Sequence, residues 1–189
     1  MEPQDLTESL HKHPFLSNMD ESLVKTLTSC ASNIVFKEGT RLFREGDDAK
    51  LFFLVRSGRV VLETQAGEKG TIRIQTVGPG EVLGWSWLIS PFKWHFDAIA
   101  LEQVHAFSID ASCLRTKCET DNHFGYEMLR RFSEVLERRL AATRLQLLDI
   151  YGSAPAESRW HTKHRRPTIK QKSNKKAHKG AKKRKVHRI

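Results

Sequence analysis

Short apolar runs separated by glycine-containing turns dominate the sequence between residues 33 and 110. Examples are the runs at 34–36, 51–55 and 71–77, and in the last of these apolar and polar residues alternate. Glycine suits the intervening turns because it adopts positive φ without a Cβ clash. Alternation with a period of two indicates strands with one buried and one hydrated face. At least seven such strands predict a β-sandwich or barrel, with jelly-roll winding as one option.

Helical patterns flank this β region. Residues 1–32 hold a weak helical stretch around 7–11 and a second helix, which we expect Asn18 to cap. Residues 111–151 predict a short helix followed by a long one over 121–151, with an apolar stripe. The stripe consists of Leu129, Phe132, Leu136, Leu140, Thr143, Leu147 and Ile150. Such a stripe is typical of a helix that packs on its own β body or on a second copy, and we expect a homodimer through it.

The net charge of +10 is concentrated in residues 152–189, which contain fourteen Lys/Arg and one acid. This segment carries +13 and leaves residues 1–151 at −3. It has too little apolar surface to offset chain entropy, so we expect a tail that is disordered in isolation. Its dense clusters are candidate contacts to nucleic acid or another anionic surface. They contain Lys175, Lys176, Lys182, Lys183, Arg184 and Lys185.

Several classes of protein are not expected. No stretch approaches the roughly 18 apolar residues of a membrane-spanning helix, and the N-terminus lacks the order of a secretion signal. Three cysteines are too few, and odd in number, for a disulfide framework, so a cytoplasmic location is expected. Cys113 and Cys118 are expected to be buried free thiols rather than metal ligands, because no second Cys/His pair lies nearby.

Four glycine-containing segments in a fixed order, followed by the long helix, resemble the cyclic-nucleotide-binding domain of the Crp/Fnr regulators over residues 15–151. The segments are Phe36-Lys37-Glu38-Gly39-Thr40, Phe43-Arg44-Glu45-Gly46-Asp47, Leu54-Val55-Arg56-Ser57-Gly58-Arg59-Val60 and Val77-Gly78-Pro79-Gly80-Glu81. The resemblance implies a mainly β fold with flanking helices. Residues 33–110 would form a jelly-roll-like β-roll (a double-stranded β-helix), followed by a long C-terminal helix. The winged helix-turn-helix of those regulators has no counterpart in residues 152–189.

The resemblance also implies a phosphate-binding cassette, from which this sequence departs. In the family a Gly-Glu pair opens a short helix, whose backbone N–H groups hold the cyclic phosphate. The Glu binds the ribose hydroxyl, and an Arg further along pairs with the phosphate. Here Gly84 keeps the Gly position, Trp85 replaces the Glu, and the Arg position falls near Trp94 or His95. Losing both contacts is expected to weaken cAMP binding about a hundredfold or more.

The candidate pocket segment is instead rich in aromatic residues, which suit a flat or apolar small ligand. Its alternative role is to fill a pocket that has lost its ligand. The predicted ligand-binding residues are Gly84, Trp85, Ser86, Trp87, Lys93, Trp94, His95 and Thr143. The resemblance places Thr143 at a base contact across the dimer, although an ordinary helix-interface role fits as well. The expected ligand is a cyclic nucleotide or another small molecule, and no metal is expected.

Two other functions compete with a non-enzymatic sensor. Gly84-Trp85-Ser86-Trp87 resembles the start of a nucleophile elbow, but Leu88 replaces the final Gly, and the chain shows no βα alternation. We therefore expect no catalysis. The second alternative is a nucleic-acid-associated regulatory protein that binds through its basic tail and uses the β-roll as a dimerisation platform.

Overall fold

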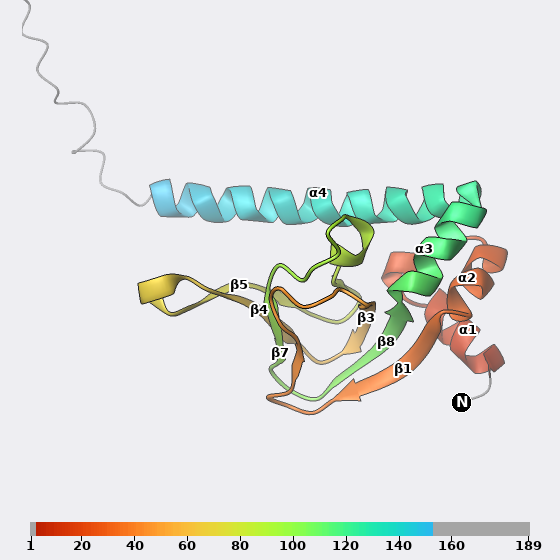
Figure 1. Ribbon diagram of the computed structural model, residues 1–189, viewed down its shortest axis with the longest axis horizontal. Coiled ribbons are helices and arrows are strands. Elements are labelled where there is room, and N and C mark those ends of the chain that lie inside the picture. Colours follow the sequence, from red (N-terminus) through yellow and green to blue (C-terminus); the bar gives the residue numbers. More distant parts are fainter. Residues whose placement is uncertain (1–2, 153–189) are drawn as a thin grey trace, which may run out of the picture. The chain divides into compact units, whose positions relative to one another are not determined.

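The computed structural model describes residues 3–152, in which the N-terminal helices lie at one end of a β body and a long C-terminal helix runs along one side of it (Figure 1). The N-terminal helices are α1 (Pro3–His11), the 3-10 turn η1 (Pro14–Leu16) and α2 (Glu21–Thr28). The C-terminal helices are α3 (Ala111–Thr120) and α4 (Asn122–Gly152). The predicted basic contacts of the tail, from Lys175 to Lys185, lie outside the described residues and stay a prediction.

Eight antiparallel strands form two four-stranded sheets. One sheet has the order β1 (Ala31–Phe36), β8 (Val104–Asp110), β3 (Leu51–Ser57) and β6 (Val82–Leu83). The other has the order β2 (Arg41–Phe43), β7 (Asp97–Ala100), β4 (Val60–Gln65) and β5 (Thr71–Val77). This arrangement confirms the predicted fold class, a mainly β roll with flanking helices and a long helix after it.

Strand β3 joins two parts of the core because both of its faces are buried. Successive side chains of a strand point to opposite faces. Phe53 and Val55 therefore enter the interior of the β-roll, whereas Phe52 and Leu54 pack against the helices. At the β3–β4 turn, Gly58 has φ +82°, and a Cβ atom there would lie 2.3 Å from the Gln103 carbonyl oxygen. The turn therefore requires glycine.

Helix α4 separates the predicted apolar stripe into two faces. Phe124, Met128 and Phe132 are fully buried against the N-terminal helices and β3. Three leucines of the stripe instead face solvent and keep about half of their surface exposed, namely Leu129 (52%), Leu140 (53%) and Leu147 (48%). One helix thus packs on its own body and also presents an unpaired apolar row.

Two local predictions are wrong. Asp20, not Asn18, is the N-cap of α2, since its carbonyl accepts from the Leu23 and Val24 amides while Asn18 turns the chain with φ 59°. Cys113 is not a free thiol, because it forms a disulfide with Cys30 across a Cα–Cα distance of 5.7 Å.

The disulfide follows from strand pairing. Cys30 immediately precedes β1 and Cys113 lies in the first turn after β8, and these strands are antiparallel neighbours. The cysteine count therefore no longer supports a reducing compartment. Cys118 is the free cysteine of the described residues and is half-buried.

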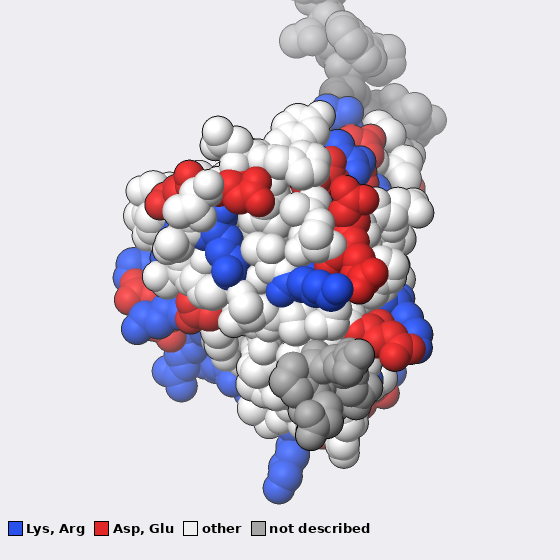
Figure 2. Space-filling view, turned by 90° about the vertical axis from the view of Figure 1, so that its right-hand side faces the viewer, with Lys and Arg blue, Asp and Glu red and all other residues white. Residues whose placement is uncertain are grey.

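The surface formed by the N-terminal helices carries acidic and basic side chains interspersed with uncharged ones (Figure 2). On this face the described residues form no continuous basic area that would attract a polyanion. Within residues 3–152, none of the helices has the length and apolar character needed to cross a membrane.

Candidate ligand site in the β-roll

The segment between β6 and β7 forms one wall of a small cavity in the β-roll. Strand β6 is placed by its pairing with β3, where Leu83 lies opposite Phe53. The 3-10 turn η3 (Ser86–Leu88) follows. The chain then leads back toward β7, and the backbone of Trp94 is fixed by two hydrogen bonds. Its amide donates to Asp47 O at 2.9 Å, and its carbonyl accepts from the Gly46 amide at 2.8 Å. This pairing fixes the direction of the Trp94 side chain.

Gly84 and Trp94 are in direct contact. Gly84 has φ +86°, and a Cβ atom on it would lie 2.5 Å from Cζ3 of Trp94. The indole is only 6% exposed, and it stacks on Phe43 with ring centroids 3.7 Å apart and planes 9° apart. The missing side chain of Gly84 therefore makes room for an indole of the protein itself.

The remaining cavity has a volume of about 20 Å³. Such a space holds about one water molecule, whereas ligand pockets usually measure about 300 Å³ or more. Its apolar walls include Phe43, Leu62 and Phe96, in addition to Gly84 and Trp94. In this conformation the cavity has no room for a nucleotide, so a ligand of that size requires Trp94 to move.

Three predicted residues form the polar edge of the cavity. Ser86 Oγ and His95 Nδ1 lie 3.0 Å apart, and the Trp85 indole stacks on the His95 imidazole with centroids 5.8 Å apart. Ser86 is only 5% exposed. No carboxylate contacts His95 among the residues described, so the pair lacks the third group that orients a catalytic base.

The other predicted residues lie away from this cavity. Trp87 is fully buried in the helix-facing core beside Phe52 and Phe132. Lys93 is exposed and forms an ion pair with Asp48, which holds the pKa of that carboxyl below its usual value through a hydrogen bond and charge. The exposed Thr143 hydroxyl donates to its own helix at Arg139 O, 2.9 Å away.

Arg139 of α4 also lines the cavity, although it was not among the predicted site residues. Its guanidinium donates from Nη2 to Val82 O in β6. Burial lowers the pKa of Arg139 below its usual value. Helical periodicity signals this position, since Arg139 follows the buried Phe132 by seven residues and Val135 by four.

Comparisons with known proteins agree with this architecture. Residues 33–121 match the family described as "Cyclic nucleotide-binding domain". The CRP-like cAMP-activated global transcriptional regulator of Mycobacterium tuberculosis is 24% identical over 145 residues, which cover 77% of this chain and 63% of that protein. Cyclic nucleotide-gated ion channel 18 of Arabidopsis thaliana is 27% identical over 132 residues, which cover 60% of this chain and 19% of the channel.

A solved structure supports the fold independently. The crystal structure of a cyclic nucleotide-binding domain from Methylobacillus flagellatus KT aligns with a TM-score of 0.66 and 19% identity, covering 78% of this chain and 83% of that one. The chain spans less than two thirds of the length of the two curated relatives. Residues 33–121 thus match a cyclic nucleotide-binding domain, and the chain has a Crp-like relative.

Proposed function

We propose that the chain is a non-enzymatic regulatory module in which a small ligand enters the β-roll and acts on α4. One observation carries the proposal: the cavity is bounded by Trp94 and Gly84 from the β-roll and by Arg139 from α4. An occupant therefore touches both the β-roll and the long helix. A ligand shifts a conformational equilibrium only if it binds one arrangement better than the other. In this proposal the two arrangements are the observed one, with Trp94 in the cavity, and a second with Trp94 displaced by the ligand.

The proposed ligand is a cyclic nucleotide or another small planar molecule. The mycobacterial relative, a cAMP-activated global transcriptional regulator, supports the first class. Entry requires the Trp94 indole to leave Phe43, which forfeits an aromatic contact worth about 0.5–1.5 kcal/mol beyond its buried area. In the proposed cassette Trp85 and Trp94 replace the ribose and phosphate contacts, so cyclic nucleotides should bind weakly. The burial of Ser86 supports a module without hydrolytic activity.

Titration with cAMP and cGMP tests the sensor. We expect a saturable change of tryptophan fluorescence in the wild type, because the Trp94 indole moves from an apolar to a more hydrated environment. Trp94→Phe should lose most of that signal, whereas Trp87→Phe should keep it because Trp87 does not line the cavity. If neither nucleotide alters the fluorescence or the melting temperature at millimolar concentration, the cyclic-nucleotide version of the proposal fails.

We also propose that α4 forms a homodimer through its exposed leucine row. Leu129, Leu140 and Leu147 are spaced by eleven and seven residues along one face of the helix, a spacing close to heptad repeats. Leu140→Asp is expected to convert the dimer to a monomer, because it buries an unpaired carboxylate at the interface. Ala141→Asp is the matched control, since that exposed residue lies about 100° away on the helix. Sedimentation equilibrium measures both, and a monomeric wild type would contradict the dimer.

A further inference from the structure

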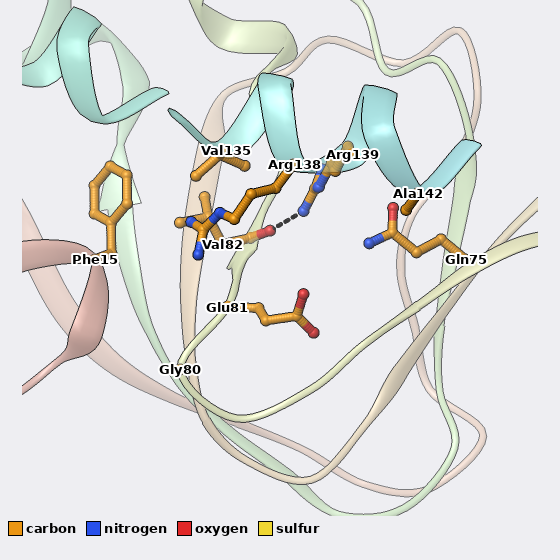
Figure 3. A pocket seen from close by; sticks show the side chains of 9 residues that line it. All are labelled: Phe15, Gln75, Gly80, Glu81, Val82, Val135, Arg138, Arg139 and Ala142. Atoms are coloured by element: carbon orange, nitrogen blue, oxygen red, sulfur yellow. Dashed lines mark hydrogen bonds between the residues drawn. The ribbon is translucent and has the colours of Figure 1, made fainter. Parts of the chain in front are cut away.

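A second cavity, of about 180 Å³, lies between α4 and the chain that enters β6. Figure 3 shows the side chains that line it, with Val135, Arg138 and Arg139 on α4 above and Gln75 and Glu81 below. It is larger than the β-roll cavity, charged and apolar side chains both line it, and Arg139 lines both cavities. A ligand reaches this second cavity without displacement of Trp94, which is not part of its lining.

Arg139 is a partly buried cation that forms no ion pair within 4.0 Å among the described residues, although Glu81 attracts it over a longer distance. Its side chain makes one hydrogen bond, to the neutral Val82 carbonyl, although a guanidinium offers five N–H donors. Arg131 of the same helix, which is only 4% exposed, is instead paired with Glu127. Buried charges in proteins are normally paired. The Arg139 guanidinium therefore keeps unused donors that an anion from outside the chain can accept.

The other polar groups of the cavity also suit an anion. Arg138 adds a second guanidinium, and the Gln75 amide points into the same space (Figure 3). Glu81 is the one carboxylate of the lining. It accepts a hydrogen bond from the Gly78 amide at 2.6 Å, and it forms no ion pair within 4.0 Å of either arginine among the residues described. Two cations and one anion leave the cavity with a net charge of +1.

We propose that this second cavity binds a phosphate group, held by the Arg139 and Arg138 guanidinium groups and the Gln75 amide. Paired guanidinium groups fit the oxygens of a phosphate in geometry and charge. The bound anion competes with Val82 O for Arg139. Val82 lies two residues before Gly84, so occupancy of this cavity also changes the wall of the β-roll cavity. The proposal stands independently of any ligand in the β-roll.

Calorimetric titration of the full chain with inorganic phosphate at constant ionic strength tests the site. Arg139→Gln is expected to weaken phosphate binding about tenfold or more, as expected for loss of a charge-assisted contact. Arg144→Gln is the matched control, because it removes the same charge from an exposed position of α4 that lines neither cavity. If both variants weaken binding equally, phosphate is held by overall charge, and the proposal is overturned.

Glu81→Gln provides a test with the opposite sign. The glutamine amide oxygen still accepts from the Gly78 amide, while the charge that opposes the anion is removed. We expect phosphate to bind several-fold more tightly, and an unchanged or weaker affinity contradicts the site. Titration with glycerol phosphate distinguishes the two sources of the phosphate group. Tighter binding than that of inorganic phosphate identifies an organic phosphate as the ligand, and equal binding identifies the free anion.

Discussion

Replacing both Cys30 and Cys113 by alanine is expected to lower the free energy of unfolding by about 4 kcal/mol. The disulfide joins positions separated by 83 residues, and the loop that it closes contains all eight strands. Cross-linking a loop of this length removes much of the conformational entropy of the unfolded chain. Urea-induced unfolding followed by tryptophan fluorescence measures the loss. An unchanged slope of the unfolding free energy against urea concentration shows that two-state unfolding persists.

Reduction supplies a second arm of the same experiment. A small dithiol transfers two electrons and two protons to the disulfide, which leaves two cysteine thiols and an oxidised cyclic dithiol. The reduced wild type should therefore match the double alanine variant. Cys118→Ala is the control, because Cys118 is free. Burial raises the pKa of its thiol to about 11, so it does not attack the disulfide at neutral pH. Identical unfolding curves with and without the dithiol would contradict the stabilising role.

The long strands and helices could be predicted because each carries a repeated signal. Period-two alternation located β5, and the glycine turns located its neighbours. The buried face predicted for β5 is wrong, because Ile72 and Ile74 are exposed. The two-residue strand β6 (Val82–Leu83) was missed, since two residues show no period. The disulfide was missed for a different reason. Its cysteines meet only through the pairing of β1 with β8, in which Ala31 lies opposite Ile109, and long-range strand register is not visible in local sequence.

The direction of each side chain in the pocket segment was less predictable. Trp87 and Trp94 belong to the same aromatic run and the same buried cluster, yet Trp87 packs beside Phe52 and Phe132, whereas Trp94 lines the β-roll cavity. The chain between them contains a 3-10 turn and a positive φ of 56° at Phe92. The direction of a side chain in this segment therefore does not follow a helical or strand period that could be read from the sequence. Arg139 shows the converse case, because its helical position indicates burial while its charge suggests the surface.

Trp85→Glu combined with Trp94→Arg is expected to tighten cAMP binding about a hundredfold or more relative to the wild type. The substitutions supply the carboxylate and guanidinium that the family's cassette uses, at the positions that follow Gly84 in the same order. Removal of the indole also vacates the space above Gly84, where Trp94 now excludes even a Cβ atom. Isothermal titration calorimetry measures the affinity, and thermal unfolding shows whether the variant remains folded.

The variant Trp94→Leu distinguishes the effect of the freed cavity volume from the effect of the added guanidinium charge. It removes the same indole from Phe43 and adds no cation, so it should open the cavity with little gain in cAMP affinity. Both substitutions at Trp94 lose the stacking contact and much buried area, at a cost in stability of about 3 kcal/mol or more. Reduction of the Cys30–Cys113 disulfide would add to that cost, so the titration belongs in non-reducing buffer. If the folded double variant binds cAMP no more tightly than Trp94→Leu, the two tryptophans do not occupy the phosphate and ribose positions, and the proposed cassette is wrong.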